Sequence, residues 1–156
     1  MMDTSSGQPT VAETLARMDE GWAAFQDRLR ALPSQLLEGH IEQGGWTRKQ
    51  MLAHISTWHE LTIERLSGLV ESGEPQGTPD HEDVINARAA RGAVGRTTGE
   101  ILLDIDHTYR QLRRKVARLT DADLSAHDSW AAAVIAGNTY GHYREHLADL
   151  DPRHKG

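Results

Sequence analysis

The chain contains no cysteine, and this absence excludes several classes of protein. Without thiols there is no disulfide framework, no thiolate metal ligand, no iron–sulfur centre and no cysteine nucleophile. No apolar run approaches the ~20 residues that a membrane-spanning helix needs. The first ten residues are small and polar, without a basic start or an apolar stretch, so we expect no secretory signal. These absences predict a cytoplasmic protein without a membrane partner.

Basic charge is also scarce. The chain has 17 Lys and Arg residues against 23 Asp and Glu residues, a formal net charge of −6. Such a chain lacks the basic surface of nucleic-acid-binding proteins, so no nucleic-acid partner is expected. Its 156 residues suit a single domain. We expect a disordered tail over residues 1–9 and one domain over residues 10–151.

Apolar residues recur at helical spacing in four long segments. The first predicted helix runs from Thr10 to Leu32 and ends at Pro33. The second begins at the capping box Thr47 to Gln50 and ends near residues 72–73. The third follows a second capping box at residues 97–100, and the fourth runs from 130 to about 150. We predict a polar turn over 121–128, with residue 129 as the fourth N-cap, and a short helix near 80–91.

Four long amphipathic helices without strand-like alternation predict an all-α fold, a four-helix bundle. The connection between the third and fourth helices is short, which favours antiparallel neighbours. The connection over 72–97 is long enough to cross the length of a helix of ~22 residues, about 33 Å. It therefore permits the second and third helices to run parallel. The predicted order is up-down-down-up, with the crossover between helices two and three.

Histidines provide the candidate site. His142 and His146 are four residues apart, so both imidazoles lie on one face of the fourth helix. His54 lies at the edge of the apolar stripe of the second helix. If these two helices are antiparallel, the three rings meet and offer a three-nitrogen metal site with open positions. The alternative interpretation is that His142 and His146 are exposed on the surface and that His54 makes a hydrogen bond in the core.

Other residues near this face are candidates for supporting roles. Asn138 and Asp149 share the face of the histidine pair and are candidates to orient a ligand ring. Trp58 is expected in the core, with a wall of the pocket as the alternative. His59 is expected to be a polar surface residue. No obvious catalytic carboxylate lies beside the histidines, and the metalloprotease motif H-E-x-x-H fails because Tyr143 follows the first histidine.

Two motifs resemble one known family. The segment Trp46-Thr-Arg-Lys-Gln-Met-Leu-Ala-His54-Ile-Ser-Thr-Trp58 resembles the W-[ST]-x-x-[DQ]-x-L-x-H-[IL]-x-x-W motif of the DinB/YfiT-like superfamily. The segment Asn138-Thr-Tyr-Gly-His142-Tyr-Arg-Glu-His146-Leu is similar to its closing H-x-x-x-H helix. Asn86 stands where these proteins often carry an asparagine. The resemblance spans essentially the whole chain.

This resemblance implies an up-down-down-up bundle that holds a divalent metal, often nickel or zinc, through His54, His142 and His146. Iron and copper also suit three imidazoles. Relatives include thiol-dependent S-transferases and the mycothiol-dependent maleylpyruvate isomerase, whose subgroup has Glu where this chain has His142. Relatives often form homodimers, which we expect here too.

Three functions stay open at this stage. The first is a metal-dependent transferase that joins a low-molecular-weight thiol to a small electrophile. A metal-dependent hydrolase of a small molecule would use the same residues. The third is a non-catalytic bundle that binds or sequesters a small molecule. The sequence names no catalytic residue beyond the metal ligands.

Overall fold

Threonine caps start the four long helices of the computed structural model, which describes residues 7–42 and 45–152. In three of them the threonine and the third helical residue form a complete capping box, with Gln50, Glu100 and Asp123 as the partners. The long helices are α1 (Val11–Ala31), α2 (Arg48–Ser72), α4 (Thr98–Ala117) and α5 (Asp121–Asn138). No strand forms within the described ranges, so the all-α class is confirmed.

Four shorter elements complete the chain: η1 (Ser34–Glu38), α3 (Glu82–Val94), α6 (Tyr140–His146) and η2 (Leu147–Leu150). Gly73 ends α2 in the left-handed conformation, with φ 78°, which glycine adopts without steric cost. The helix expected near 80–91 forms as α3. Most of the tail expected over 1–9 lies outside the described residues.

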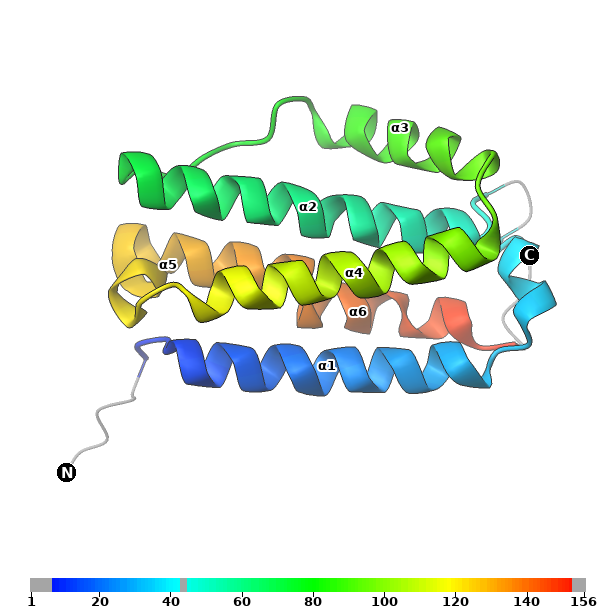
Figure 1. Ribbon diagram of the computed structural model, residues 1–156, viewed down its shortest axis with the longest axis horizontal. Coiled ribbons are helices and arrows are strands. Elements are labelled where there is room, and N and C mark those ends of the chain that lie inside the picture. Colours follow the sequence, from blue (N-terminus) through cyan, green and yellow to red (C-terminus); the bar gives the residue numbers. More distant parts are fainter. Residues whose placement is uncertain (1–6, 43–44, 153–156) are drawn as a thin grey trace.

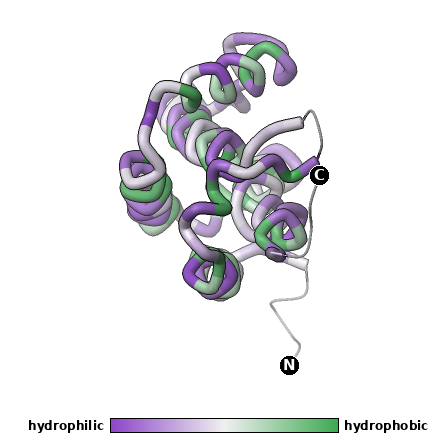
Figure 2. The backbone as a smooth tube through the Cα atoms, turned by 90° about the vertical axis from the view of Figure 1, so that its right-hand side faces the viewer, coloured by the Kyte–Doolittle hydropathy of each residue, from purple (hydrophilic) through white to green (hydrophobic). Residues whose placement is uncertain are grey.

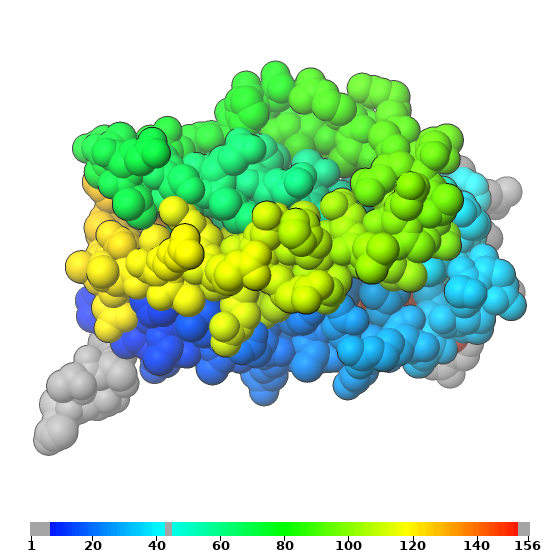
Figure 3. Space-filling model, viewed as in Figure 1, coloured from blue at the N-terminus to red at the C-terminus, as the bar shows by residue number. Residues whose placement is uncertain are grey.

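The elements lie side by side along one axis (Figure 1). In that view α1 runs from left to right, α2 and α4 run back, and α5 and α6 return to the right. Viewed from the end, α3 lies outside α2 (Figure 2). The space-filling view shows α4 at the front, between α2 above and α1 below (Figure 3). None of these helices within the described ranges has the length and apolarity to cross a membrane.

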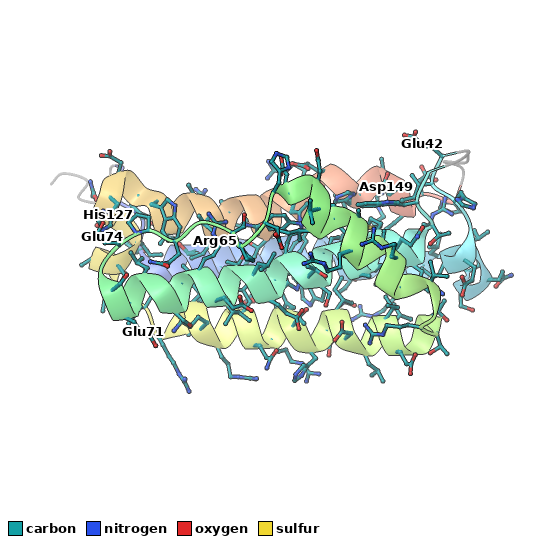
Figure 4. The ribbon with its side chains drawn as sticks, turned by 90° about the horizontal axis from the view of Figure 1, so that it is seen from above. Glu42, Arg65, Glu71, Glu74, His127 and Asp149 are labelled. Atoms are coloured by element: carbon teal, nitrogen blue, oxygen red, sulfur yellow. The ribbon has the colours of Figure 1, made fainter. Side chains whose placement is uncertain are left out.

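An extended segment connects the far end of α2 to α3 and brings the chain back along the bundle (Figure 4). Arg65, near the middle of α2, holds this segment because its Nε donates to the carbonyl oxygen of Gln76 at 2.8 Å. At the turn itself, a ring nitrogen of His127 lies 2.8 Å from the carbonyl oxygen of Gly73. The segment therefore places α3 beside the first half of α2.

The core lies between α1, α2, α4 and the α5–α6 arm. Each fully buried Leu, Ile, Phe or Met side chain contributes about 1.5–3 kcal/mol relative to an exposed one. Those with no exposed surface include Met18, Phe25, Met51, Leu52, Ile55, Leu66, Leu112, Leu124 and Ile135.

The fourth helix differs from the prediction. The segment over 121–128 is not a polar turn, because α5 begins at Asp121. An interruption follows at 126–129, where Ser129 has φ 61° instead of the extended conformation that is usual for an N-cap. Helical dihedrals resume at Trp130, where the fourth helix was predicted to begin. A second break occurs at Thr139, with φ −125° and ψ −105°, so the histidine pair lies on the separate helix α6.

Close backbone approaches explain why α6 is set apart. A Cβ on Gly141 would lie 2.8 Å from the carbonyl oxygen of Ala136, and a Cβ on Gly21 would lie 2.8 Å from Cβ of Tyr140. Only glycine fits at such distances, so Gly141 permits the break and Gly21 lets α1 approach α6. Helical periodicity in the sequence carries no information about either contact.

Candidate metal centre

Three histidines from two helices meet at one end of the bundle. Their ring centroids are 4.8 Å apart for His54 and His142, 4.8 Å for His142 and His146, and 5.5 Å for His54 and His146. One ring nitrogen from each lies within 4.8 Å of the others. The capping box of α2 and the short helix α6 thus bring together the three residues that the sequence nominated.

The tautomer of His54 follows from its neighbours. The indole Nε1–H of Trp58 can only donate, and it lies 2.7 Å from Asn86 Oδ1. The same oxygen lies 3.0 Å from His54 Nδ1, so Nδ1 carries the proton and donates. In the neutral ring His54 Nε2 then keeps its lone pair. An outer hydrogen bond of this kind fixes the orientation of a metal-binding histidine.

His146 is oriented in the same way by Asp149, three residues later. Its Nδ1 lies 2.7 Å from Asp149 Oδ2 and donates to this carboxylate, which leaves Nε2 free. The segment that carries Asp149 is held by the buried side chain of Arg48, whose Nε donates to the carbonyl oxygen of Asp149 at 2.6 Å. Asp149 lies at the right-hand end of Figure 4, beside the start of α2.

His142 is the least satisfied of the three. Its Nε2 lies 2.9 Å from His54 Nε2, and its buried Nδ1 has no hydrogen-bond partner among the described residues. If His142 Nε2 carried the proton and donated to His54, Nδ1 would be a buried acceptor without a donor. If Nε2 keeps its lone pair, two lone pairs face each other. A cation between the two Nε2 atoms satisfies both lone pairs, with the remaining proton of His142 on Nδ1.

Burial keeps two of the rings neutral. Burial and, to a smaller extent, the charge of His146 lower the pKa of His54 to about 4, against the hydrogen bond to Asn86, which raises it. Burial, followed by the charges of the neighbouring histidines, lowers the pKa of His142 to about 3. Both side chains are 7% exposed. A neutral imidazole is the form that binds a metal, so the pair is ready for one near pH 7.

The donor set fits a divalent ion. Two nitrogens that bind one ion at about 2.05 Å lie about 2.9 Å apart at a right angle and about 3.3 Å apart in tetrahedral geometry. His54 Nε2 and His142 Nε2, 2.9 Å apart, already have such a spacing, and the third nitrogen, within 4.8 Å of both, reaches the same ion after a small shift of the His146 ring. Three imidazoles leave further coordination positions open on the ion. The cluster is therefore a possible metal site.

A pocket of about 350 Å³ opens onto the histidines. Trp58, which is buried, lines this pocket and also contacts Asn86. Asn138 lines it as well, but its Nδ2 donates to the carbonyl oxygen of Val134 on its own helix and holds no imidazole. Asn86 on α3, not Asn138, is the amide that orients a ligand ring, because it accepts from His54.

Sequence reasoning missed two carboxylates of the pocket. Glu82 on α3 and Glu145 on α6 both line it, although no obvious catalytic carboxylate was expected beside the histidines. Glu145 could have been found, because it follows His142 by three residues and so shares its helix face. Glu82 could not, because its position depends on how α3 lies on α2.

His59 was also placed wrongly: it has no exposed surface. Burial raises the pKa of Tyr143 well above its ordinary value, so its hydroxyl stays protonated and donates to His59 Nε2 at 2.7 Å. His59 Nδ1 then donates to Thr108 Oγ1 at 2.8 Å. The chain extends through Ser56, whose hydroxyl lies 3.1 Å from Thr108 Oγ1 and donates to Asp104 at 3.0 Å. These bonds join α2, α4 and α6 behind the histidine cluster.

Comparison with known proteins identifies the family. No curated protein and no solved structure matches the chain. The family model of the DinB superfamily matches residues 17–149, a range that contains α2, α3, α6 and all three clustered histidines. The chain therefore belongs to the DinB superfamily.

Proposed function

We propose that this protein is a metal-dependent enzyme in which His54, His142 and His146 hold one divalent ion. The observation that carries the proposal is the facing pair of imidazole nitrogens, His54 Nε2 and His142 Nε2, 2.9 Å apart at the base of a pocket. We take α5 and α6 together as the fourth helix of an up-down-down-up bundle. Nickel and zinc are the ions we propose first.

The proposed reaction is the transfer of a low-molecular-weight thiol to a small electrophile. A bound divalent ion lowers the pKa of a coordinated thiol or water. Because the chain has no cysteine, the thiol must come from a small cosubstrate. Hydrolysis of a small molecule uses the same ligand set with water in place of the thiol, and a sequestering protein would use it without turnover.

The protein's own residues would orient and shield this site. Asn86 and Asp149 hold the Nδ1 protons of His54 and His146, so that both Nε2 lone pairs stay available. The ring of Trp46 packs at 5.1 Å from the ring of His54 and covers one side of it. Trp58 forms an apolar wall of the pocket, against which an electrophile can lie.

The experiment is metal analysis of untagged protein after incubation with nickel, zinc or cobalt. We expect about one ion per chain in the wild type and in the control variant His107→Ala, whose histidine is exposed on α4. His54→Ala and His142→Ala should lose most of it. Asp149→Ala should weaken binding by about 10- to 100-fold, because an outer partner of a ligand ring is removed. Equal metal content in all variants would contradict the proposal.

Activity separates the three candidate functions. Transfer of a thiol to any member of an electrophile panel, lost in His54→Ala, supports the transferase, and hydrolysis with the same dependence supports the hydrolase. A site that only stabilises the fold would instead show a large drop of Tm on chelation. The homodimer expected from the resemblance is part of this proposal, and light scattering tests it.

A further inference from the structure

Among the described residues, the charged side chains that line the histidine pocket are acidic, the histidines aside. Apart from the histidines, the charged residues that line it are Glu82 and Glu145, and no lysine or arginine lies among its lining residues. Glu82 precedes Asn86 by four residues on α3, and Glu145 follows His142 by three on α6. Residues at these spacings share a helix face, so each carboxylate lies on the same side as the residue that builds the site.

Neither carboxylate has a basic partner among the described residues. Within residues 7–42 and 45–152, no Lys or Arg forms an ion pair with Glu82 or Glu145. Carboxylates elsewhere on the surface do have such partners: Asp80 pairs with Arg88 at 3.3 Å, and Asp104 with Arg96 at 3.4 Å. The two pocket glutamates are therefore available to a ligand.

The nearest basic side chain in sequence points into another groove. Arg144 immediately precedes Glu145, but it lines the groove between α1 and α6 together with Arg17. A ligand in the histidine pocket thus meets negative charge at its outer end. A carboxylate or phosphate there would be repelled, whereas an ammonium group would be attracted.

A neutral donor completes the lining. Asn86 Oδ1 already accepts from Trp58 and His54, so the Nδ2 hydrogens of this amide remain. Among the described residues no acceptor binds them. Asn86 lines the pocket, so its amide can donate to a carbonyl or hydroxyl oxygen of a ligand.

We infer that the small molecule bound here is a cation: an amine whose ammonium group lies against Glu82 and Glu145 while its thiol reaches the histidine cluster. This inference rests on the proposed function and names its substrate class. A unit charge about 4 Å away in water is worth about fivefold in affinity. The two carboxylates together should give about five- to 25-fold preference over a neutral ligand of the same size, and a still larger preference over an anion, which they repel.

The test compares two thiols of similar size on the cobalt-loaded protein. Thiocholine carries a fixed positive charge and cannot chelate through nitrogen, whereas mercaptoacetate is an anion. Their dissociation constants are measured from the thiolate-to-cobalt absorption band in the wild type, in the double variant Glu82→Gln/Glu145→Gln and in the control Glu71→Gln. Glu71 lies at the opposite end of α2 (Figure 4).

We expect the affinity ratio of thiocholine to mercaptoacetate to fall at least fivefold in the double variant and to stay unchanged in Glu71→Gln. The difference should shrink in high salt, because exposed charges are screened. An unchanged ratio in the double variant would overturn the inference, whatever the absolute affinities.

A second readout keeps the inference apart from the proposed function. If cobalt does not bind, the metal proposal fails, and the charge preference is then measured on the metal-free protein by the NMR signal of the Trp58 indole N–H. Thiocholine should shift this signal, mercaptoacetate should not, and the shift should vanish in the double variant. Equal shifts by both thiols would refute the inference.

Discussion

Tyr143→Phe tests whether the hydrogen-bonded chain behind the histidines stabilises the fold. The change removes one hydroxyl that donates to His59 Nε2 at 2.7 Å. Tyr143 is 1% exposed and His59 is 0% exposed, so water cannot replace the lost donor. A buried acceptor left without a partner costs about 1–3 kcal/mol. For a domain of this size, that lowers Tm by about 2–12 °C.

Tyr140→Phe is the matched control. It deletes the same atom three residues earlier on α6, but the Tyr140 hydroxyl has no hydrogen bond to the described residues, and its side chain is only half-buried. Its Tm should change by no more than about 1–2 °C. Thermal unfolding of both metal-free variants followed by circular dichroism gives the comparison. Equal shifts in the two variants would refute the reasoning, because the cost would then not come from the buried acceptor.

Two further predictions concern protons and glycines. Burial lowers the pKa of His59 to about 3, so His59 stays neutral in the folded chain while the unfolded chain takes up a proton below about pH 6.5. The protein should thus become less stable as the pH is lowered. Between pH 7 and pH 5 this residue alone should reduce the free energy of unfolding, measured in urea, by about 2 kcal/mol. If His59→Gln showed the same dependence of stability on pH, the prediction would be contradicted. Gly21→Ala should destabilise by about 1–3 kcal/mol because its Cβ would meet Tyr140 at 2.8 Å. Gly92→Ala on α3, where an added Cβ would meet no other atom within 4 Å, should stabilise the fold by about 0.5–1 kcal/mol. A higher urea midpoint for Gly21→Ala than for Gly92→Ala would contradict both predictions.

Helix ends that are set by capping residues close in sequence could be predicted from the sequence. Thr47 and Gln50 form both bonds of the predicted capping box, and α1 ends at Ala31, one residue before the predicted end. Such caps involve residues at most four apart, so a single sequence contains all the information. The capping box of Thr120 was missed because Asp123, rather than Glu or Gln, is its partner.

The candidate site divides in the same way. His142 and His146 could be paired from their spacing, and His54 could be added from its position at the edge of the apolar stripe of its helix. The role of Asn86 and the position of Glu82 could not be predicted, because both depend on how α3 packs against α2. The break at Thr139 was invisible for a related reason: the apolar residues keep their helical spacing across it, and only the contact between Gly141 and Ala136 marks it.

That break has a consequence for how the protein tolerates change. In one uninterrupted helix, any substitution that rotated the segment near 130–138 would also swing the imidazoles of His142 and His146 away from His54. Here α6 takes its angular position from Tyr143 against α2 and from Asp149 held by Arg48. The bundle can therefore accumulate substitutions along α5 while the direction of the ligands is preserved, whereas a one-residue insertion between 142 and 146 would turn one of the two histidines away.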